Sequence, residues 1–233
     1  MKFDAYALKG RIAPAFFSII IPIMIFNHFY VSEEFSKFVG DVIGAKLISN
    51  LTISGICLVF LSEFGRIIGK NVFEKSFFRD EKYMPTTNYM LFNDSIYSEQ
   101  HKNKIRDKMA SDFAVSLPTK EEEEVDQDNA RTRIVEVMAL VRKKLYNNKF
   151  LLQHNIEYGA MRNVIGGSVI GLVLSLINII FFSFTAPNIL AVTISMATFA
   201  IYFLLVVLSK YIIGFYGNNY AKILYREYLG ENS

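Results

Sequence analysis

Residues 155–184 read NIEYGAMRNVIGGSVIGLVLSLINIIFFSF, and this stretch decides the fold. From Val164 to Phe184 it contains no charged side chain. These roughly 21 residues predict a membrane-spanning helix, because about 20 helical residues cross the hydrocarbon core of a bilayer. Within this helix Gly167, Gly171 and Ser175 recur every four residues. Small residues at that spacing let two helix backbones approach closely, so we expect helix packing along this stripe.

The composition is typical of a membrane protein that also has an aqueous part. The chain has 233 residues, of which 52% are hydrophobic and 20% are charged, and its mean hydropathy is +0.27. Such values exceed those of ordinary soluble domains, while the charged fraction requires a region in water. The net charge of +3 is too small to imply nucleic-acid binding by itself. The single cysteine, Cys57, excludes an internal disulfide and a cysteine-based metal site within one chain.

Further apolar runs predict three more spans, at residues 12–31, 42–61 and 189–208. Basic residues gather before the first span, around the polar middle of the chain and after the last span, which indicates that these parts are cytosolic. We therefore predict an all-α membrane protein with four transmembrane helices and a small helical cytosolic domain inserted between helices 2 and 3. The predicted parts are transmembrane helices 1 and 2 at 1–64, the cytosolic domain at 65–162, transmembrane helices 3 and 4 at 163–208, and a C-terminal amphipathic tail at 209–233.

The polar middle of the chain has helix signals and no convincing strand pattern. A surface helix is predicted near Ser98, and Thr119 with Glu122 three residues later forms a capping box, which starts a helix. From Ala130 to Leu145 the apolar residues keep helical spacing. This helix either ends near Asn147 or continues past it toward the third span.

Polar side chains inside the predicted spans are the candidate pore lining. Lys46, Asn50 and Ser54 lie four residues apart and so share one face of the second span, and Ser175 and Asn178 lie in the third. Polar groups in a span usually face the bundle interior or a water-filled path, and rings of them set selectivity in channels. The alternative is that Lys46 extends to the membrane interface and Asn50 hydrogen-bonds a neighbouring helix.

Four charged residues form a predicted ionic collar at the cytosolic edge of the membrane. Glu63 and Arg66 end the second span, and Glu157 and Arg162 precede the third. If these spans are antiparallel neighbours, Glu63 can pair with Arg162 and Glu157 with Arg66. Partly desolvated pairs of this kind are costly to break once formed. The collar is either a hinge that transmits a cytosolic event to the spans or an interfacial cluster that anchors the helices.

Basic residues of the cytosolic domain are the candidate ligand contacts. They form two clusters, with Lys102, Lys104 and Arg106 in the first, and Arg131, Arg133, Arg142, Lys143 and Lys144 in the second. Basic clusters bind phosphate-bearing ligands, but they also face anionic lipid or plain solvent. The residues alone leave all three interpretations open.

No catalytic or metal-binding pattern is present in the sequence. The three histidines are far apart and have no ligand-like spacing, and there is no glycine-rich phosphate loop, nucleophile elbow or HExxH motif. The sequence therefore predicts a protein that is not an enzyme, with no catalytic residue, no metal site and no cofactor.

Two parts of the chain resemble a family of small bacterial membrane proteins. The first is FLSEFGRIIGK at 60–70 with PTTNYMLFNDS at 85–95, and the second is LLQHNIEYGAMRN at 151–163, before the glycine-rich span. The family pattern corresponds here to Pro85, Thr86, Thr87, Asn155, Tyr158, Gly159, Arg162 and Asn163, with Ala160 and Met161 in place of an aromatic and a basic residue. In these features the chain resembles the membrane effectors of bacterial anti-phage systems, in particular those of the Hailong type.

The resemblance implies a homo-oligomeric channel, such as a tetramer, in the bacterial inner membrane with both termini in the cytosol. Its functional partner would be a nucleotidyltransferase, whose nucleotide or oligonucleotide product binds the cytosolic domain and opens the channel. Opening would depolarise an infected cell. The residues alone are compatible with such a channel, but also with a non-conducting scaffold that recruits a cytosolic partner. A small transporter is disfavoured, because the chain lacks repeats and has only Lys46 as an ionisable side chain within a span.

Overall fold

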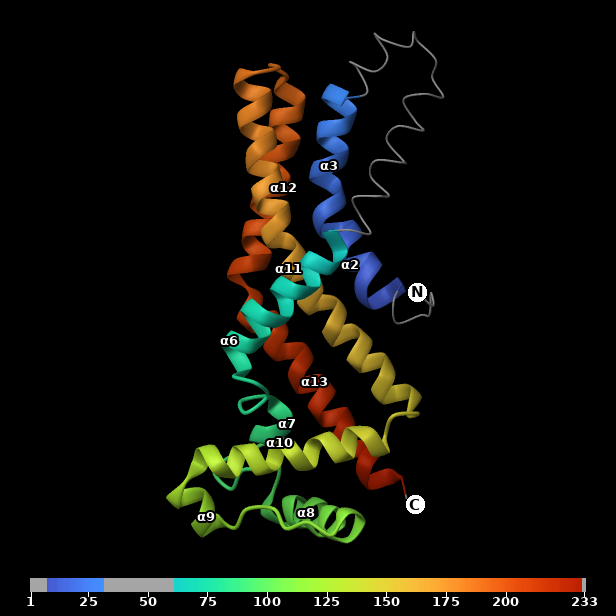
Figure 1. Cartoon of the computed structure of the whole chain (residues 1–233), viewed down its shortest axis with the longest axis vertical. Coiled ribbons are helices and arrows are strands. Elements are labelled where there is room, and N and C mark those ends of the chain that lie inside the picture. The colour runs from blue at the N-terminus through green and yellow to red at the C-terminus, as the bar shows by residue number, and fades with distance from the viewer. Residues whose placement is uncertain (1–7, 32–60, 232–233) are drawn as a thin grey trace. The chain divides into compact units, whose positions relative to one another are not determined.

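The computed structural model describes residues 8–31 and 61–231, and every regular element within these ranges is a helix (Figure 1). The prediction of an all-α fold is confirmed for this part of the chain. The chain divides into two compact units. Unit 1 comprises Met1–Phe73 and Gly159–Lys210, and unit 2 comprises Glu74–Tyr158 and Tyr211–Ser233. Two long helices, α11 (Lys149–Phe184) and α13 (Ser209–Gly230), have residues in both units.

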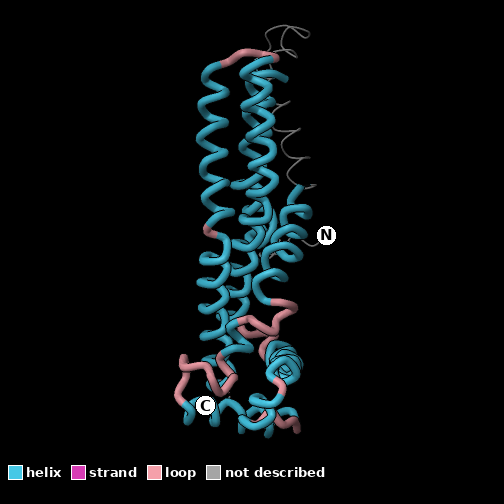
Figure 2. The backbone as a smooth tube through the Cα atoms, turned by 90° about the vertical axis from the view of Figure 1, so that its left-hand side faces the viewer, coloured by secondary structure: helices cyan, strands magenta, loops and turns pink. Residues whose placement is uncertain are grey.

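Three helical stretches among the described residues are long and apolar enough to cross a membrane, namely Ala13–Val31, Lys149–Phe184 and Ile189–Val207. The last of these is α12, which a short turn connects to α11 (Figure 2). Asn188 caps α12 by accepting a hydrogen bond from the backbone N–H of Ala191 at 3.0 Å. The predicted second span at 42–61 lies almost entirely outside the described residues, so the total of four spans stays a prediction.

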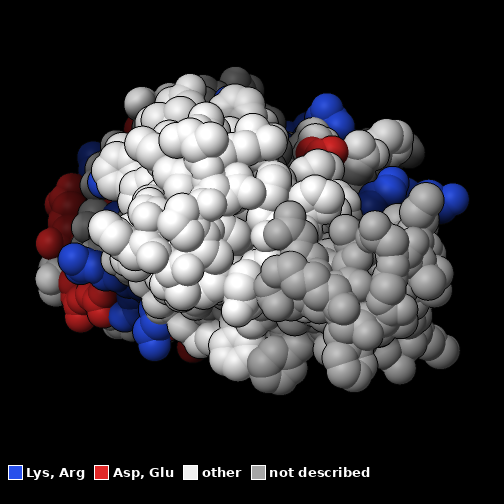
Figure 3. Space-filling model, turned by 90° about the horizontal axis from the view of Figure 1, so that it is seen from above, with Lys and Arg blue, Asp and Glu red and all other residues white. Residues whose placement is uncertain are grey.

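The surface over α11 and α12 is apolar. No lysine, arginine, aspartate or glutamate occurs between Asn163 and Ser209. Figure 3 looks down onto the end of unit 1 that carries the turn between these helices, and the described surface there is white. Large apolar side chains such as Val173, Ile180 and Phe203 are more than half exposed along both helices. Such surface favours a hydrocarbon environment.

The N-terminal span alternates between π-helical and α-helical turns. Its elements are η1 (Leu8–Ile12), α2 (Ala13–Ala15), η2 (Phe16–Ile20), α3 (Ile21–Phe26) and η3 (Asn27–Val31). In a π-helix each N–H bonds the carbonyl five residues earlier, so Pro22 provides no donor for Phe17. The hydroxyl of Tyr202 on α12 donates to the Phe17 carbonyl oxygen at 3.2 Å. A neighbouring helix thus replaces the donor that the proline lacks.

Pro14 produces the same situation nearer the N-terminus. In α-helical bonding the N–H of residue 14 donates to the carbonyl of Gly10, and proline has no N–H. The side-chain amide of Asn163 on α11 donates to the Gly10 carbonyl oxygen at 2.7 Å, and Asn163 is buried. Backbone groups in hydrocarbon must find partners inside the protein, which explains why a polar side chain faces each proline-interrupted turn.

Glycines allow the helices of unit 1 to approach closely. A Cβ atom on Gly167 or Gly171 would overlap atoms of Ser18, so both glycines lie directly against η2. A Cβ atom on Gly166 would overlap the carbonyl oxygen of Gly65, which belongs to a helical segment that continues into η4 (Gly69–Glu74). The structure therefore places Gly167 and Gly171 of the predicted small-residue stripe against η2, and the adjacent Gly166 against the segment that contains Gly65.

Unit 2 is built from shorter helices around one core. They are α6 (Lys75–Phe78), α7 (Pro85–Asn88), α8 (Glu99–Phe113), α9 (Lys120–Val125), α10 (Gln127–Lys144), the first part of α11 and most of α13. The predicted capping box is confirmed, because Thr119 accepts from the N–H of Glu122 and the Glu122 carboxylate accepts from the N–H of Thr119.

The chain breaks between α10 and α11 and does not continue as one helix. The break covers residues 145–148. The side chain of Asn148 accepts a hydrogen bond from the N–H of Leu151 at 2.9 Å and so caps α11. This settles the choice that the helical spacing alone left open.

The C-terminal helix α13 supplies a large part of the core of unit 2. Leu224, Tyr225 and Tyr228 are completely buried there. The Tyr225 hydroxyl donates to the carbonyl oxygen of Thr86, so the polar end of a buried ring has a partner. The predicted division into a domain at 65–162 and a separate tail at 209–233 therefore differs from the observed units. Residues of the predicted tail pack against residues that the prediction assigned to the cytosolic domain.

Candidate functional site

The first basic cluster is engaged by backbone carbonyls of unit 2. Lys102 is 2% exposed, and its ammonium donates to the carbonyl oxygens of Leu91, at 2.5 Å, and Asp94. Arg106 donates to the carbonyl oxygen of Met90 at 2.6 Å. Burial lowers the pKa of both side chains. These two cations tie together the carbonyl groups of the turn that connects α7 to α8.

Two arginines of the second cluster hold a strained turn between α6 and α7. Residues 79–81 all have positive φ, from 43° to 73°, although none is a glycine. Left-handed backbone costs about 1–2 kcal/mol at such a residue. Arg142 donates to the carboxylate of Glu81 at 2.6 Å, and Arg131 donates to the carbonyl oxygen of Lys82 at 2.8 Å. Both arginines come from α10, which fixes the turn against that helix.

The remaining members of the second cluster divide into paired and exposed side chains. Arg133 donates to the carboxylate of Glu122 at 3.0 Å, and Lys144 donates to that of Asp112 at 2.8 Å. Six of the eight predicted ligand contacts are thus engaged within unit 2. The other two, Lys104 of the first cluster and Lys143 of the second, are exposed.

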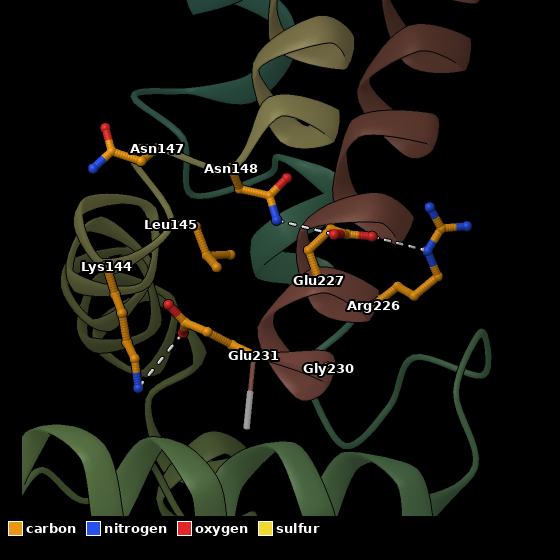
Figure 4. A pocket seen from close by; sticks show the side chains of 8 residues that line it. All are labelled: Lys144, Leu145, Asn147, Asn148, Arg226, Glu227, Gly230 and Glu231. Carbon is orange, nitrogen blue, oxygen red and sulfur yellow. Dashed lines mark hydrogen bonds and ion pairs between the residues drawn. The ribbon is translucent and has the colours of Figure 1, made fainter. Parts of the chain in front are cut away.

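A pocket of about 590 Å³ lies where α10 ends, α11 begins and α13 ends (Figure 4). It is the candidate binding site of unit 2. Its lining residues are mainly polar or charged and come from the end of α10, from the break between α10 and α11, and from the end of α13 with the residue that follows it. They are Lys144, Leu145, Asn147, Asn148, Arg226, Glu227, Gly230 and Glu231.

The carboxylate of Glu227 organises one wall of this pocket. It accepts hydrogen bonds from the side-chain amide of Asn148 at 2.9 Å and from the Nε of Arg226 at 3.2 Å. Asn148 therefore uses its oxygen to cap α11 and its nitrogen to bind α13. The Arg226 side chain is 65% exposed, so its terminal nitrogens are accessible from solvent.

Lys144, which also lines the pocket, belongs to a hydrogen-bonded group with Asp112 and Tyr228, which lie outside the lining. The Asp112 carboxylate accepts from Lys144 at 2.8 Å and from the Tyr228 hydroxyl at 2.8 Å. The hydrogen bond from Lys144 holds the pKa of Asp112 below its usual range. Burial and this carboxylate raise the pKa of Tyr228. Lys144 also lies 3.6 Å from a carboxylate oxygen of Glu231, so its charge is shared between Asp112 on α8 and the residue that follows α13.

The charges in the pocket are balanced, and the amide groups add neutral donors and acceptors. Arg226 offers the planar donors that bind phosphate or carboxylate oxygens. The side chains of Asn147 and Asn148 offer groups of the kind that bind a base edge or a sugar hydroxyl. The arrangement suits a polar ligand that carries both an anionic group and hydrogen-bonding groups.

The candidate pore residues of the third span are engaged between helices of unit 1. The hydroxyls of Ser175 and Thr198 lie 3.1 Å apart, which links α11 to α12. Asn178 donates its side-chain amide to the carbonyl oxygen of Pro22 at 2.8 Å, which links α11 to α3. Both predicted residues are buried. The other candidates are outside the described residues, namely Lys46, Asn50 and Ser54.

The collar residues have contacts within their own helices. Arg66 donates to the carboxylate of Glu63, three residues earlier, at 2.7 Å. The carboxylate of Glu157 lies 3.1 Å from the ring nitrogen of His154 on α11. Arg162 is half-buried on the same helix. The pairing across helices stays a prediction.

Several pocket residues had no role in the sequence prediction. Arg226, Glu227 and Glu231 lie within the tyrosine-rich stretch at 209–233 that was expected to form a separate tail. A signal was present, because Tyr220, Leu224 and Tyr228 repeat every four residues. An apolar stripe of that kind predicts a helix packed against a core, which would have brought its polar face beside other elements of unit 2.

Comparisons with known proteins add no relative. No family model, no curated protein and no solved structure matches this chain.

Proposed function

We propose that the protein is a homo-oligomeric membrane channel whose cytosolic helical unit binds a nucleotide or oligonucleotide. In this proposal it acts as an effector of anti-phage defence of the Hailong type, and a partner nucleotidyltransferase makes the ligand. The observation that carries the proposal is the division of the chain into a unit with charge-free, span-length helices and a charged helical unit with a polar pocket. A membrane part and a binding part in one small chain are what a ligand-gated channel requires.

The ligand in this proposal binds the pocket of Figure 4. Its anionic group contacts Arg226. The exposed Lys143, which precedes the pocket residue Lys144 in the sequence, adds positive charge. Its hydrogen-bonding groups contact Asn147 and Asn148. Binding there involves residues of α10, of α13 and of the break that leads into α11, so it changes how these elements are held together. A ligand shifts an equilibrium only by its difference in affinity between two states, and a pocket between separate elements of the chain can supply such a difference.

The polar contacts of unit 1 bear on where a pore runs. Ser175 and Asn178 bond to neighbouring helices of the same protomer, so they are the less suitable pore lining. The pore of the proposed channel therefore runs between protomers and is lined by Lys46, Asn50 and Ser54 of the second predicted span.

A non-conducting scaffold is the second candidate. It is favoured by the same buried contacts, because Ser175 and Asn178 are engaged between helices of one protomer and so line no water path there. A scaffold would use unit 2 to recruit a soluble partner.

The test is ion flux through liposomes that contain the full-length protein, with and without short oligonucleotides and cyclic nucleotides. We expect flux that appears only with one ligand. Arg226→Gln should raise the ligand concentration required by about tenfold or more, because a charge-assisted hydrogen bond is lost. Lys222→Gln is the matched control, since Lys222 is exposed on the same helix, one turn from Arg226, and does not line the pocket. Absence of flux from folded, inserted protein under every condition would refute the channel and favour the scaffold.

A further inference from the structure

A surface hollow with acidic side chains lies where α10 of unit 2 begins. The hollow has a volume of about 320 Å³ and is lined by Glu121, Glu122, Val125, Asp126, Asn129, Ala130 and Arg133. Val125 at its edge is 88% exposed, which is unusual for an apolar side chain at the end of a helix. Glu121 and Glu124 are exposed beside it. This end therefore combines uncovered apolar surface with negative charge.

The other end of α10 is basic and carries protruding aromatic rings. Tyr146 is 81% exposed and Phe150 is 64% exposed, just after the helix ends. Lys143 and Lys149 are exposed on either side of Tyr146 in the sequence. Tyr146 and Val125 are the two most exposed large apolar side chains among the described residues of unit 2. The second end therefore matches the first in apolar character and opposes it in charge.

The two ends cannot meet within one chain. They are joined by α10, which Figure 1 shows as one unbroken helix with α9 at one end and the start of α11 at the other. Its 18 residues span about 27 Å, because an α-helix rises 1.5 Å per residue. Contact between the basic end and the acidic end thus requires two copies of the chain.

We propose that unit 2 assembles head to tail, with the basic, aromatic end of α10 in one copy docked on the acidic end of α10 in the next. Tyr146 enters the hollow beside Val125. Lys143 and Lys149 face Glu121 and Glu124 of the neighbouring copy. The occupant is a second copy because the chain itself provides both complementary surfaces.

A contact of this type joins two different surfaces, and such contacts close into rings when the rotation between copies allows it. The inference deepens the proposed homo-oligomer by naming the surfaces that join its protomers. It also places the ligand pocket next to the contact, since Lys144, Leu145 and Asn147 line the pocket and flank Tyr146. A ligand in that pocket would act directly on the interface.

Cross-linking in the full-length protein tests the contact. Two differently tagged proteins, Val125→Cys and Tyr146→Cys, are each made with Cys57→Ser, mixed in detergent, reconstituted and treated with a short bismaleimide. We expect a cross-linked dimer from the mixture and none from either protein alone. Ile96→Cys replaces Val125→Cys in the control mixture, because Ile96 is 52% exposed elsewhere on unit 2. A dimer from one protein alone, or equal yields with the control, overturns the inference.

Reversal of charge on both surfaces provides a second test. A restored yield after the second reversal shows that the first variant still folds. Lys143→Glu with Lys149→Glu should lower the yield by about tenfold or more, because like charges would then face each other. Adding Glu121→Lys with Glu124→Lys on the partner protein should restore the yield. A yield that stays unchanged on reversal, or low after the exchange, overturns the head-to-tail contact. Ligand-dependent flux without the cross-link would refute the head-to-tail contact and support the channel function. The cross-link without any flux would support the contact and refute the channel function.

Discussion

Replacement of Asn163 by leucine tests whether a side chain on α11 replaces the backbone donor that Pro14 lacks. The side-chain amide of Asn163 donates to the Gly10 carbonyl oxygen at 2.7 Å in a buried part of unit 1. A buried carbonyl that loses its partner costs about 1–3 kcal/mol, and hydrogen bonds between membrane helices average about 0.6 kcal/mol. We therefore expect Asn163→Leu to lower the free energy of unfolding by about 1–2 kcal/mol.

The size of this loss should depend on residue 14. Pro14→Ala provides an N–H that an α-helix directs at the same carbonyl oxygen. In that background Asn163→Leu should cost about 1 kcal/mol less, which is the coupling energy of the double-mutant cycle. Other contacts of the Asn163 side chain are lost in both backgrounds and cancel from the cycle.

The free energies can be measured on full-length protein in detergent micelles, by titration with a denaturing detergent followed by circular dichroism. Ser168→Ala is the matched control, because Ser168 is buried on the same helix and its hydroxyl donates to the carbonyl oxygen of Val164 within α11. Its effect should be the same with proline or alanine at position 14. A coupling energy near zero for Asn163→Leu would refute the compensation.

Three further predictions use the same measurement. Gly166→Ala should destabilise the protein, since its Cβ would overlap backbone of the facing segment, whereas Gly159→Ala has nothing within 4 Å and should have little effect. Ala114→Gly should stabilise by about 1 kcal/mol, because this residue ends α8 with φ 52°, and Ala110→Gly inside the same helix should destabilise by a similar amount. The pKa of Asp112 is lower in the folded protein than in the unfolded chain, where it is about 4. The ionised carboxylate therefore stabilises the fold above about pH 4, and this stabilisation is lost as the pH falls through the folded pKa. Asp112→Asn should therefore reduce the loss of stability between about pH 4 and pH 2, and an unchanged acid profile would contradict this.

The basic clusters illustrate why site prediction from sequence was incomplete. Lys102 and Arg106 look like surface charges in a polar segment, and nothing local shows that they reach carbonyl groups of a turn eight to sixteen residues earlier in the chain. Burial of a cation depends on which other elements surround it. The exposed Lys104 and the buried Lys102 are only two residues apart.

The pocket also depends on a contact that the sequence does not indicate. Asn148 caps α11 and also binds Glu227, which is 79 positions away in the sequence. The capping role is a local preference that a sequence can indicate. The contact with Glu227 exists only because α13 packs into the core of unit 2.

Local properties of the sequence determined the helical class, the span-length apolar runs at the first, third and fourth positions, and the start of α9 at Thr119. Each follows from composition, periodicity or a capping pattern, which act over a few residues. Only the tertiary structure decided that α13 belongs to the core of unit 2, that Ser175 and Asn178 bind neighbouring helices, and that Asn163 and Tyr202 serve the two prolines of the first span. These outcomes depend on which segments meet in space, because a buried polar group takes whichever partner the packing brings within reach.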